Sequence, residues 1–413
     1  MMKTKKILAL LLAFLLVVGS MVACSSQNSP NNSNDTSTPS SDSNNDTSST
    51  PDNSSTEPIY IGISAGITGS APSEGESMVN TITLAVEQIN AAGGVLGGRQ
   101  IELVVEDDQY TTDGAINAVN KLIAHGKLSA IIGPHRSNLV IATDTMIADA
   151  GIPILTGGSS TTFYELENDY IFRIRASDSV VTQIAAKYVV EECDPTVVGM
   201  MYISSDYGTS AEKSIREYME NAGVEFVSEA FNSGDVDMTG QILTMKNAGV
   251  DVLIGWGDGQ EATVIARQLH ELDYHPMVIG SAGFSNPTFL DSCEEEYANG
   301  IYSFAEFSSL TKTEIVQDFL KAYEKRFGVA ADAHAGIYYN TAFLLADAIE
   351  RAGSSDPEAI RDALTQTKEF NSTIGYLTTD ERNDMVHNMT LFVNDGLLPT
   401  PLKTFYEDGY GEP

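Results

Sequence analysis

Residues 128–162 read LSAIIGPHRSNLVIATDTMIADAGIPILTGGSSTT, and this stretch decides the fold. Two short apolar runs, at 130–132 and 152–155, each end on glycine and small polar residues. Between them, apolar residues recur at close to helical spacing, which is typical of an amphipathic helix. The stretch therefore predicts a strand, a loop, a helix and a second strand, which together form a parallel β-α-β unit.

The loops that follow the two predicted strands are candidates for a binding site. Ser137 stands where the N-cap of the helix is expected, so backbone N–H groups and the positive end of the helix dipole would face an open crevice. After the second strand, the run Gly-Gly-Ser-Ser-Thr-Thr at 157–162 lets a ligand approach the backbone and adds hydroxyl groups. Two such loops side by side would hold a small anion, most simply a carboxylate. The alternative is that Ser137 only caps its helix and that the glycine-serine run is only a turn.

The composition limits the class of protein. The chain has 413 residues, enough for two domains, and 42% of them are hydrophobic, which supports real cores. A formal net charge of −34 argues against nucleic-acid binding, because phosphates would be repelled. None of the three cysteines lies in a CxxC pair, which argues against a structural zinc site. Cys193 and Cys293 could form a disulfide only if the fold brings them together, and the sequence leaves this open.

The N-terminal residues have the features of a targeting signal. Lysines precede an apolar run at 7–18 that is too short to span a membrane comfortably, so residues 1–23 predict a signal peptide. The signal ends in small residues before Cys24, which resembles the lipobox of bacterial lipoproteins. Cys24 would then be lipid-modified; the alternative is an ordinary signal peptide with a chance cysteine. Residues 24–57 are almost entirely Ser, Asn, Thr, Asp and Pro, which predicts a disordered tether.

Beyond the tether, predicted strands and helices alternate twice, first from a strand at 59–64 and again from a strand at 197–203. This pattern predicts an α/β fold with two doubly wound parallel-sheet lobes. Such sheets bind ligands at the carboxyl ends of their strands, which in two lobes can face one another across a cleft. Two late alternating runs, at 389–393 and 402–406, predict a strand pair that returns to a lobe begun earlier. The expected lobes are an N-terminal lobe of 58–176 and 307–380 and a C-terminal lobe of 177–306 and 381–413.

No motif indicates an enzyme, a cofactor or a metal. The run Gly-Ile-Thr-Gly at 66–69 lacks the G-x-G-x-x-G spacing of dinucleotide sites, and no G-x-S-x-G elbow, P-loop or H-E-x-x-H motif occurs. Three consecutive acids at 106–108 could indicate a metal, but no second cluster of ligands accompanies them. We therefore expect neither catalysis nor a bound cofactor.

The order of these elements resembles the branched-chain amino acid (Leu/Ile/Val) binding proteins, which have the type I periplasmic-binding fold of ABC importers. The resemblance covers about residues 58–407. The stretches that carry it are 61–69 with the helix at 78–94, Ile-Ile-Gly-Pro at 131–134, Gly-Ile-Pro-Ile at 151–154 and Ser-Asp-Tyr-Gly at 205–208. The lipoprotein signal fits the same family independently.

The resemblance implies roles for several residues. A serine that binds the ligand carboxylate matches Ser137, and a loop that contacts the amino and carboxyl groups matches Gly158, Ser159 and Ser160. An aromatic residue that closes over the ligand from the second lobe matches Tyr207.

Other positions depart from the family pattern. Where the family has the glutamate that neutralises the ligand ammonium, this chain has Ala282. A tyrosine of the family's first loop is replaced by Glu74, and an apolar residue of the family's pocket wall is replaced by His334. Asp258, after a predicted strand, is the best substitute partner for a cation; the alternative is a solvated turn residue. A pocket that contains Glu74, Asp258 and His334 would be more polar than one built for leucine.

We therefore expect a lipid-anchored, extracytoplasmic solute-binding protein with two lobes joined by a multi-strand hinge. It would capture an amino acid or a similar small carboxylate, zwitterion or amide, and deliver it to the permease of an ABC importer. The expected anchor is the cell membrane of a bacterium. The alternative is a sensor of the same fold that reports ligand to a signalling partner.

Overall fold

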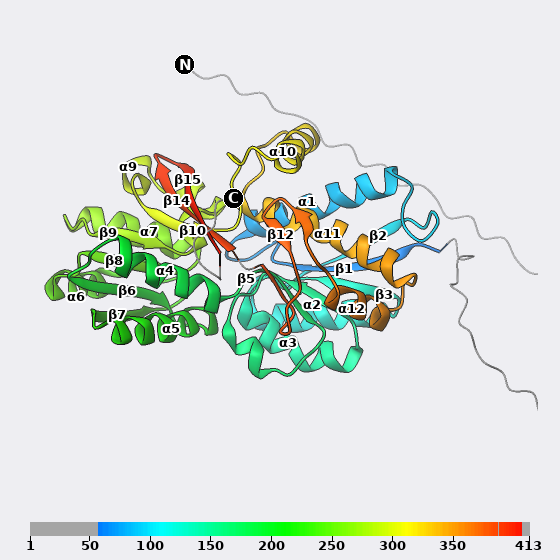
Figure 1. Cartoon of the computed structure of the whole chain (residues 1–413), viewed down its shortest axis with the longest axis horizontal. Coiled ribbons are helices and arrows are strands. Elements are labelled where there is room, and N and C mark those ends of the chain that lie inside the picture. Colours follow the sequence, from blue (N-terminus) through cyan, green and yellow to red (C-terminus); the bar gives the residue numbers. More distant parts are fainter. Residues whose placement is uncertain (1–56, 387, 407–413) are drawn as a thin grey trace, which may run out of the picture. The chain divides into compact units, whose positions relative to one another are not determined.

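The computed structural model describes residues 57–386 and 388–406 (Figure 1). The predicted signal peptide, Cys24 and residues 24–56 of the predicted tether lie outside the described residues. Across the described ranges, no helix combines the length and apolarity needed to cross a membrane.

The first of the two large sheets in the described chain has six strands, in the order β13-β5-β4-β3-β1-β2, and all neighbouring strands are parallel. Its strands are β1 (Ile59–Ala65), β2 (Ile101–Asp107), β3 (Leu128–Ile132), β4 (Ile154–Thr156), β5 (Ile171–Ala176) and β13 (Asp384–Val386). Its helices and outer hairpin are α1 (Pro72–Ala91), α2 (Thr112–Ala124), α3 (Ser137–Ala150), η1 (Thr161–Glu165), α10 (Glu314–Phe327), α11 (Ala333–Ala352), α12 (Pro357–Thr365), β11 (Phe370–Ser372) and β12 (Gly375–Leu377). We call this set of elements the first lobe.

The second large sheet has seven strands among the described residues, in the order β15-β14-β10-β9-β8-β6-β7. The strands are β6 (Val197–Ile203), β7 (Glu225–Phe231), β8 (Val252–Trp256), β9 (Met277–Gly280), β10 (Tyr302–Ala305), β14 (Asn388–Asp395) and β15 (Leu398–Tyr406). Its helices are α4 (Asp178–Glu192), α5 (Asp206–Ala222), α6 (Thr239–Ala248), α7 (Gly259–Glu271), η2 (Ala282–Ser285), α8 (Pro287–Ser292) and α9 (Glu295–Ala298). This second lobe is parallel except for β14 and β15, an antiparallel pair that joins β10.

The predictions of an α/β fold, of the β3-α3-β4 unit and of a late strand pair are therefore confirmed. Within the described chain, the connections between the two sheets follow β5, β10 and β13. The first two expected lobe boundaries fall at the first two connections. The third, at 380/381, falls before β13, which still pairs with β5 in the first sheet.

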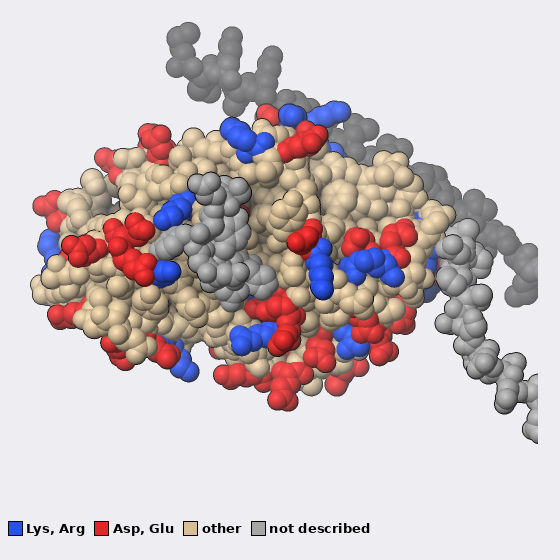
Figure 2. Space-filling view, viewed as in Figure 1, with Lys and Arg blue, Asp and Glu red and all other residues tan. Residues whose placement is uncertain are grey.

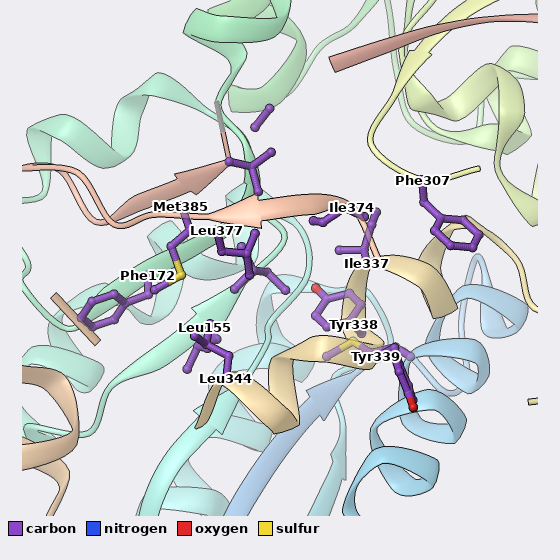
Figure 3. Close-up of a cluster of buried hydrophobic side chains, with 14 of the residues drawn as sticks. Leu155, Phe172, Phe307, Ile337, Tyr338, Tyr339, Leu344, Ile374, Leu377 and Met385 are labelled. Atoms are coloured by element: carbon purple, nitrogen blue, oxygen red, sulfur yellow. The ribbon is translucent and has the colours of Figure 1, made fainter. Parts of the chain in front are cut away.

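Both faces of each sheet are buried, as doubly wound sheets require. In β3, Ala130 and Ile132 belong to the core shared with α1 and α11, whereas Ile131 belongs to the core under α2 and α3. This alternation follows from the pleat of a strand, in which successive side chains point to opposite faces. Figure 3 shows part of the core that includes Ala130 and Ile132, where Met385 of β13 and Leu377 of β12 lie in the same cluster as Phe172 of β5.

Cys193 and Cys293 are free thiols, so the structure contains no disulfide between them. Acidic side chains are spread over much of the face shown in Figure 2 rather than gathered in one patch. On this face, the negative charge is therefore distributed and marks no single binding patch.

Candidate ligand-binding site

A cavity of about 280 Å³ lies where the carboxyl ends of strands from both sheets meet. This volume is near the lower end of the range of about 300–1,000 Å³ that is usual for small-molecule sites. The first lobe contributes side chains from α1, from the segments after β2, β3 and β4, and from the start of α11. The second lobe contributes the segments after β6, β7, β8, β9 and β10. The predicted location at the strand ends agrees with this placement.

Most of the predicted site residues line this cavity. They are Glu74, Ser137, Gly158, Ser159, Tyr207, Asp258 and His334, and Ala282 lines it as well. Ser160 does not line the cavity: it is fully buried, and its single hydroxyl hydrogen has two acceptors within reach, Thr162 Oγ1 at 3.1 Å and Asp206 O at 3.4 Å. Its side chain also accepts the N–H of Thr162, so it caps η1.

Ser137 is not the N-cap of its helix, so that prediction is wrong. Arg136 holds the N-cap position with extended backbone, and Ser137 is the first residue of α3. The Ser137 Oγ instead accepts the N–H groups of Ser159 at 3.0 Å and Ser160 at 3.1 Å, 22 and 23 residues further along the chain. The hydroxyl therefore ties the two predicted ligand loops together.

These two bonds determine what the Ser137 hydroxyl can offer a ligand. A hydroxyl has one donor hydrogen and two acceptor lone pairs. Two backbone N–H groups use the lone pairs, and among the described residues no acceptor for the hydrogen is found. The Ser137 hydroxyl can therefore still donate one hydrogen bond to a ligand in the cavity, but its acceptor positions are filled. The first-turn N–H groups of α3 and the positive end of its dipole lie at the same point, which favours an anion there.

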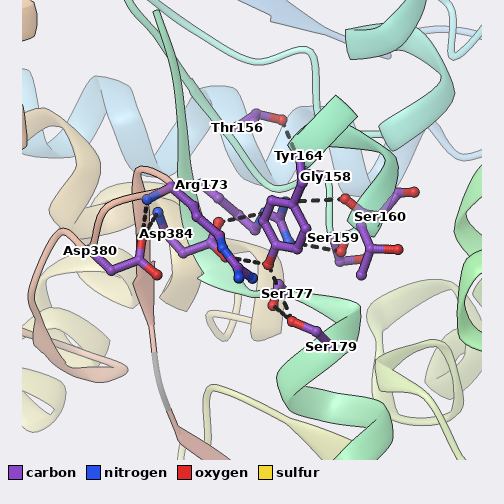
Figure 4. A network of polar contacts seen from close by, with 12 residues as sticks. Thr156, Gly158, Ser159, Ser160, Tyr164, Arg173, Ser177, Ser179, Asp380 and Asp384 are labelled. Carbon is purple, nitrogen blue, oxygen red and sulfur yellow. Dashed lines mark hydrogen bonds and ion pairs between the residues drawn. The ribbon is translucent and has the colours of Figure 1, made fainter. Parts of the chain in front are cut away.

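A buried arginine holds the glycine-serine loop in place (Figure 4). Arg173 Nη1 and Nη2 donate to the carbonyl oxygens of Ser159 at 3.0 Å and Ser160 at 3.1 Å. The Arg173 Nε lies 3.1 Å from Asp384 Oδ1, so the ion pair links the loop to β13. Arg173 was not predicted, although two arginines within the buried strand Ile-Phe-Arg-Ile-Arg-Ala were a signal.

Two of the predicted acids face an arginine of the chain itself. The Arg136 Nη2 lies 3.3 Å from Asp258 Oδ2 and 3.7 Å from Glu74 Oε2. The guanidinium carbon lies 4.1 Å from the centre of the Tyr110 ring, which is a cation–π contact. Burial alone would lower the pKa of Arg136, but Asp258 and Glu74 outweigh it and raise the pKa above its ordinary value. Asp258 comes from the second lobe, so this ion pair joins the lobes.

Glu74 makes a second connection between the lobes. Its Oε1 accepts hydrogen bonds from Asn286 Nδ2 and Thr288 Oγ1, both at 2.9 Å. Only 2% of its surface is exposed, and this burial raises the pKa of Glu74 to about 7 despite the nearby Arg136. The protonated carboxyl is therefore well populated at neutral pH.

Two histidines form a buried pair in the cavity wall. The Nε2 atoms of His135 and His334 are 3.2 Å apart, and His135 Nδ1 lies 2.8 Å from the Tyr338 hydroxyl. Burial and the nearby arginines lower the pKa of His135, and the same burial lowers the pKa of His334 to about 4. Both rings are neutral at pH 7. Within residues 57–386 and 388–406, no group of three or more His, Cys, Asp or Glu side chains is suited to a metal ion.

Another ion pair at the cavity joins Arg175 of β5 to Glu306, which follows β10. The Arg175 Nε and Nη2 donate to the two carboxylate oxygens at 2.8 and 3.3 Å. This fork lies where the chain passes between the sheets. Sequence reasoning missed Arg136, Arg175, His135, Tyr110 and Glu306 as lining residues.

The fold and the cavity define a two-lobed α/β solute-binding protein, and comparison with known proteins specifies the family. The family model described as "Periplasmic binding protein" matches residues 58–396, and the chain belongs to this family. The Leu/Ile/Val-binding protein BraC3 of Rhizobium johnstonii is 29% identical over 332 residues, which are 79% of this chain and 89% of that protein. The leucine-, isoleucine-, valine-, threonine- and alanine-binding protein of Pseudomonas aeruginosa is 26% identical over 339 residues, covering 80% of this chain and 88% of that protein.

Solved structures show the same fold. The leucine-binding protein LivK from Thermotoga maritima superposes with a TM-score of 0.79 at 22% identity, covering 85% of this chain and 99% of that one. The branched-chain amino acid transporter substrate-binding protein LivJ from Streptococcus pneumoniae, in complex with isoleucine, gives a TM-score of 0.76 at 26% identity and covers 84% and 99%. The resemblance to the Leu/Ile/Val-binding proteins with the type I periplasmic-binding fold is therefore confirmed.

Proposed function

We propose that this protein is an extracytoplasmic, lipid-anchored solute-binding protein that captures an amino acid or similar small carboxylate and delivers it to an ABC importer. The observation that carries the proposal is the Ser137 hydroxyl, which lines the cavity, has its acceptor capacity filled by two backbone N–H groups, and keeps a donor hydrogen for a ligand. A carboxylate is the ligand that best complements this donor together with the start of α3. The relatives described above are named as binding proteins for leucine, isoleucine and valine, which supports a ligand with a carboxylate.

The proposed mechanism is capture without bond making or breaking. Ligand held by the first lobe stabilises the closed arrangement, because residues of the second lobe, such as Tyr207, add contacts only when the lobes are together. The inter-lobe contacts of Glu74 with Asn286 and of Arg136 with Asp258 define the walls of the closed cavity. Ligand binding thereby favours the closed arrangement of the two lobes, which is the form that a permease would recognise.

A panel of amino acids, amides and small carboxylic acids screened by thermal shift tests the binding proposal. A ligand present at 100 times its Kd adds about 2.7 kcal/mol of stability, so a true ligand raises the melting temperature clearly. We expect only compounds with a carboxylate to do so. If no carboxylate stabilises the protein, the proposal is wrong.

The anchor is tested separately. We expect the full chain expressed in a bacterium to fractionate with the membrane and a Cys24→Ala variant to lose lipid labelling. A Cys24→Ala variant that is still labelled would contradict lipidation at Cys24. Reconstituted transport with a candidate permease and its ATPase distinguishes import from sensing, since a sensor would bind ligand without supporting uptake.

A further inference from the structure

We infer that the cavity selects small carboxylic acids that carry no α-ammonium group, and that Arg136 sets this selectivity by occupying the place of a ligand cation. The inference rests on the proposed function and narrows the class of its ligand. Arg136 would then be the residue that separates simple or hydroxylated acids from amino acids of the same carbon skeleton.

The first ground is the position of the Arg136 guanidinium. It lies in the cavity between Asp258 and Glu74, at 3.3 and 3.7 Å from their nearest oxygens, and over the ring of Tyr110. The side chains of Arg136, Asp258 and Glu74 are 16%, 29% and 3% exposed, so the guanidinium is shielded from water more on the side of Glu74 than on that of Asp258. An ammonium that approached Asp258 would have to displace a guanidinium that already has a salt bridge and an aromatic face.

The second ground is that the other acids at the cavity also have partners. Glu306 is held in a fork by Arg175, and the Oε1 of Glu74 accepts two hydrogen bonds from the second lobe. These acids and Asp258 are the carboxylates among the described residues that line the cavity. Each of the three carboxylates therefore already has a partner within the chain, and Asp258 and Glu74 share Arg136.

The third ground is that several groups at the cavity have an unused hydrogen-bond donor. The Nε of Arg136 is buried without a hydrogen-bond partner among the described residues, and the Ser137 hydroxyl has an unused donor. The Tyr110 hydroxyl, also buried without a partner there, can donate as well. The Nδ1 of His334 is also without a partner among the described residues, and it donates or accepts according to its tautomer. Unused donors beside two guanidiniums favour a carboxylate over an ammonium, because an ammonium can donate hydrogen bonds but cannot accept them.

The test measures affinities of matched pairs of ligands for the full chain by isothermal titration calorimetry. The pairs are 4-methylpentanoate against leucine and 3-phenylpropanoate against phenylalanine, with 2-hydroxy-4-methylpentanoate as the isosteric hydroxy acid. We expect at least one acid to bind about tenfold or more tightly than its amino counterpart, a difference of about 1.4 kcal/mol. Amino acids that bind as tightly as the acids, or more tightly, would overturn the inference and leave the proposed function standing. If no compound of either kind binds, the proposed function itself fails.

Variants then assign the selectivity to Arg136. In Arg136→Gln, Asp258 and Glu74 lose their cation, so the preference should shift toward the amine-bearing member of each pair by about tenfold or more. Arg326→Gln is the matched control, because it removes an arginine fork to Glu87, with both contacts at 2.9 Å, on the surface away from the cavity. The control should leave the preference unchanged.

Two further outcomes keep the assignment open to contradiction. If Arg136→Gln weakens both members of each pair equally, Arg136 acts only by holding the lobes together, and its role in selectivity is refuted. If that variant does not fold, Asp258→Asn replaces it. The inference expects this substitution to leave the ranking of acids over amino acids intact, whereas a selective loss of amino-acid binding would show that Asp258 meets the ligand ammonium.

Discussion

Replacing Ser137 with alanine tests how the structure holds its ligand loops. The Ser137 Oγ accepts two backbone N–H groups, from Ser159 and Ser160, in a site where only 3% of the serine is exposed. An unsatisfied buried polar group costs about 1–3 kcal/mol, so losing the acceptor for two such groups should lower the free energy of unfolding by about 2–6 kcal/mol. The ligand carboxylate would lose a donor in addition, which should weaken binding by a further 1–3 kcal/mol or about 5- to 150-fold.

Chemical denaturation and calorimetry separate these two effects. Denaturation of the unliganded protein measures the first, and titration with the acid that binds most tightly measures the second. Ser372→Ala is a matched control, because the Ser372 hydroxyl also accepts a backbone N–H, from Ile374 at 3.2 Å, but lies outside the cavity. The control should lose stability without losing affinity. A Ser137→Ala protein that binds as tightly as the wild type would refute the placement of the carboxylate at Ser137.

Three further predictions concern pH, the hinge and the leader. Because burial raises the pKa of Glu74 from 4.5 to about 7, the folded protein holds a proton that the unfolded chain releases, so the contribution of Glu74 to stability falls as the pH rises from 4.5 to 7. Glu74→Gln should flatten that part of the curve of unfolding free energy against pH, and an unchanged slope would contradict the assignment. Asp384→Asn should lower the free energy of unfolding by about 3–5 kcal/mol, since it leaves the buried Arg173 unpaired, and a loss below 1 kcal/mol in denaturation experiments would argue against that pair. Deletion of residues 1–56 should leave the ligand Kd unchanged while releasing the protein from the membrane, and a truncated protein that does not bind would show that the leader has a role in the site.

The fold could be predicted because local patterns and the global architecture agree. The stretch at 128–162 contains a strand, a helix and a strand whose apolar residues fall on the faces that the structure buries. The late strand pair was signalled by alternating residues around Asn-Asp-Gly. Hydrophobic period and turn residues are properties of neighbouring residues, so a sequence displays them directly.

The site could be predicted only in part, because its chemistry depends on contacts between residues far apart in sequence. Ser137 was expected to cap α3, but its hydroxyl finds the N–H groups of the next strand-end loop instead. Asp258 was expected to pair with a cation of the ligand, but in the structure it pairs with Arg136 of the other lobe. Neither partner is visible in a local window. Ser160 illustrates the same limit, since its neighbour in sequence lines the cavity whereas its own hydroxyl caps η1.

The most direct test of the central claim is a crystal structure of the full chain with the small carboxylic acid that stabilises it most in the thermal-shift screen. The account predicts the acid in the cavity between the lobes, with a carboxylate oxygen about 2.5–3.0 Å from the Ser137 Oγ and facing the first turn of α3. A carboxylate that points away from Ser137 toward the second lobe, or an acid bound outside the cavity, would contradict it.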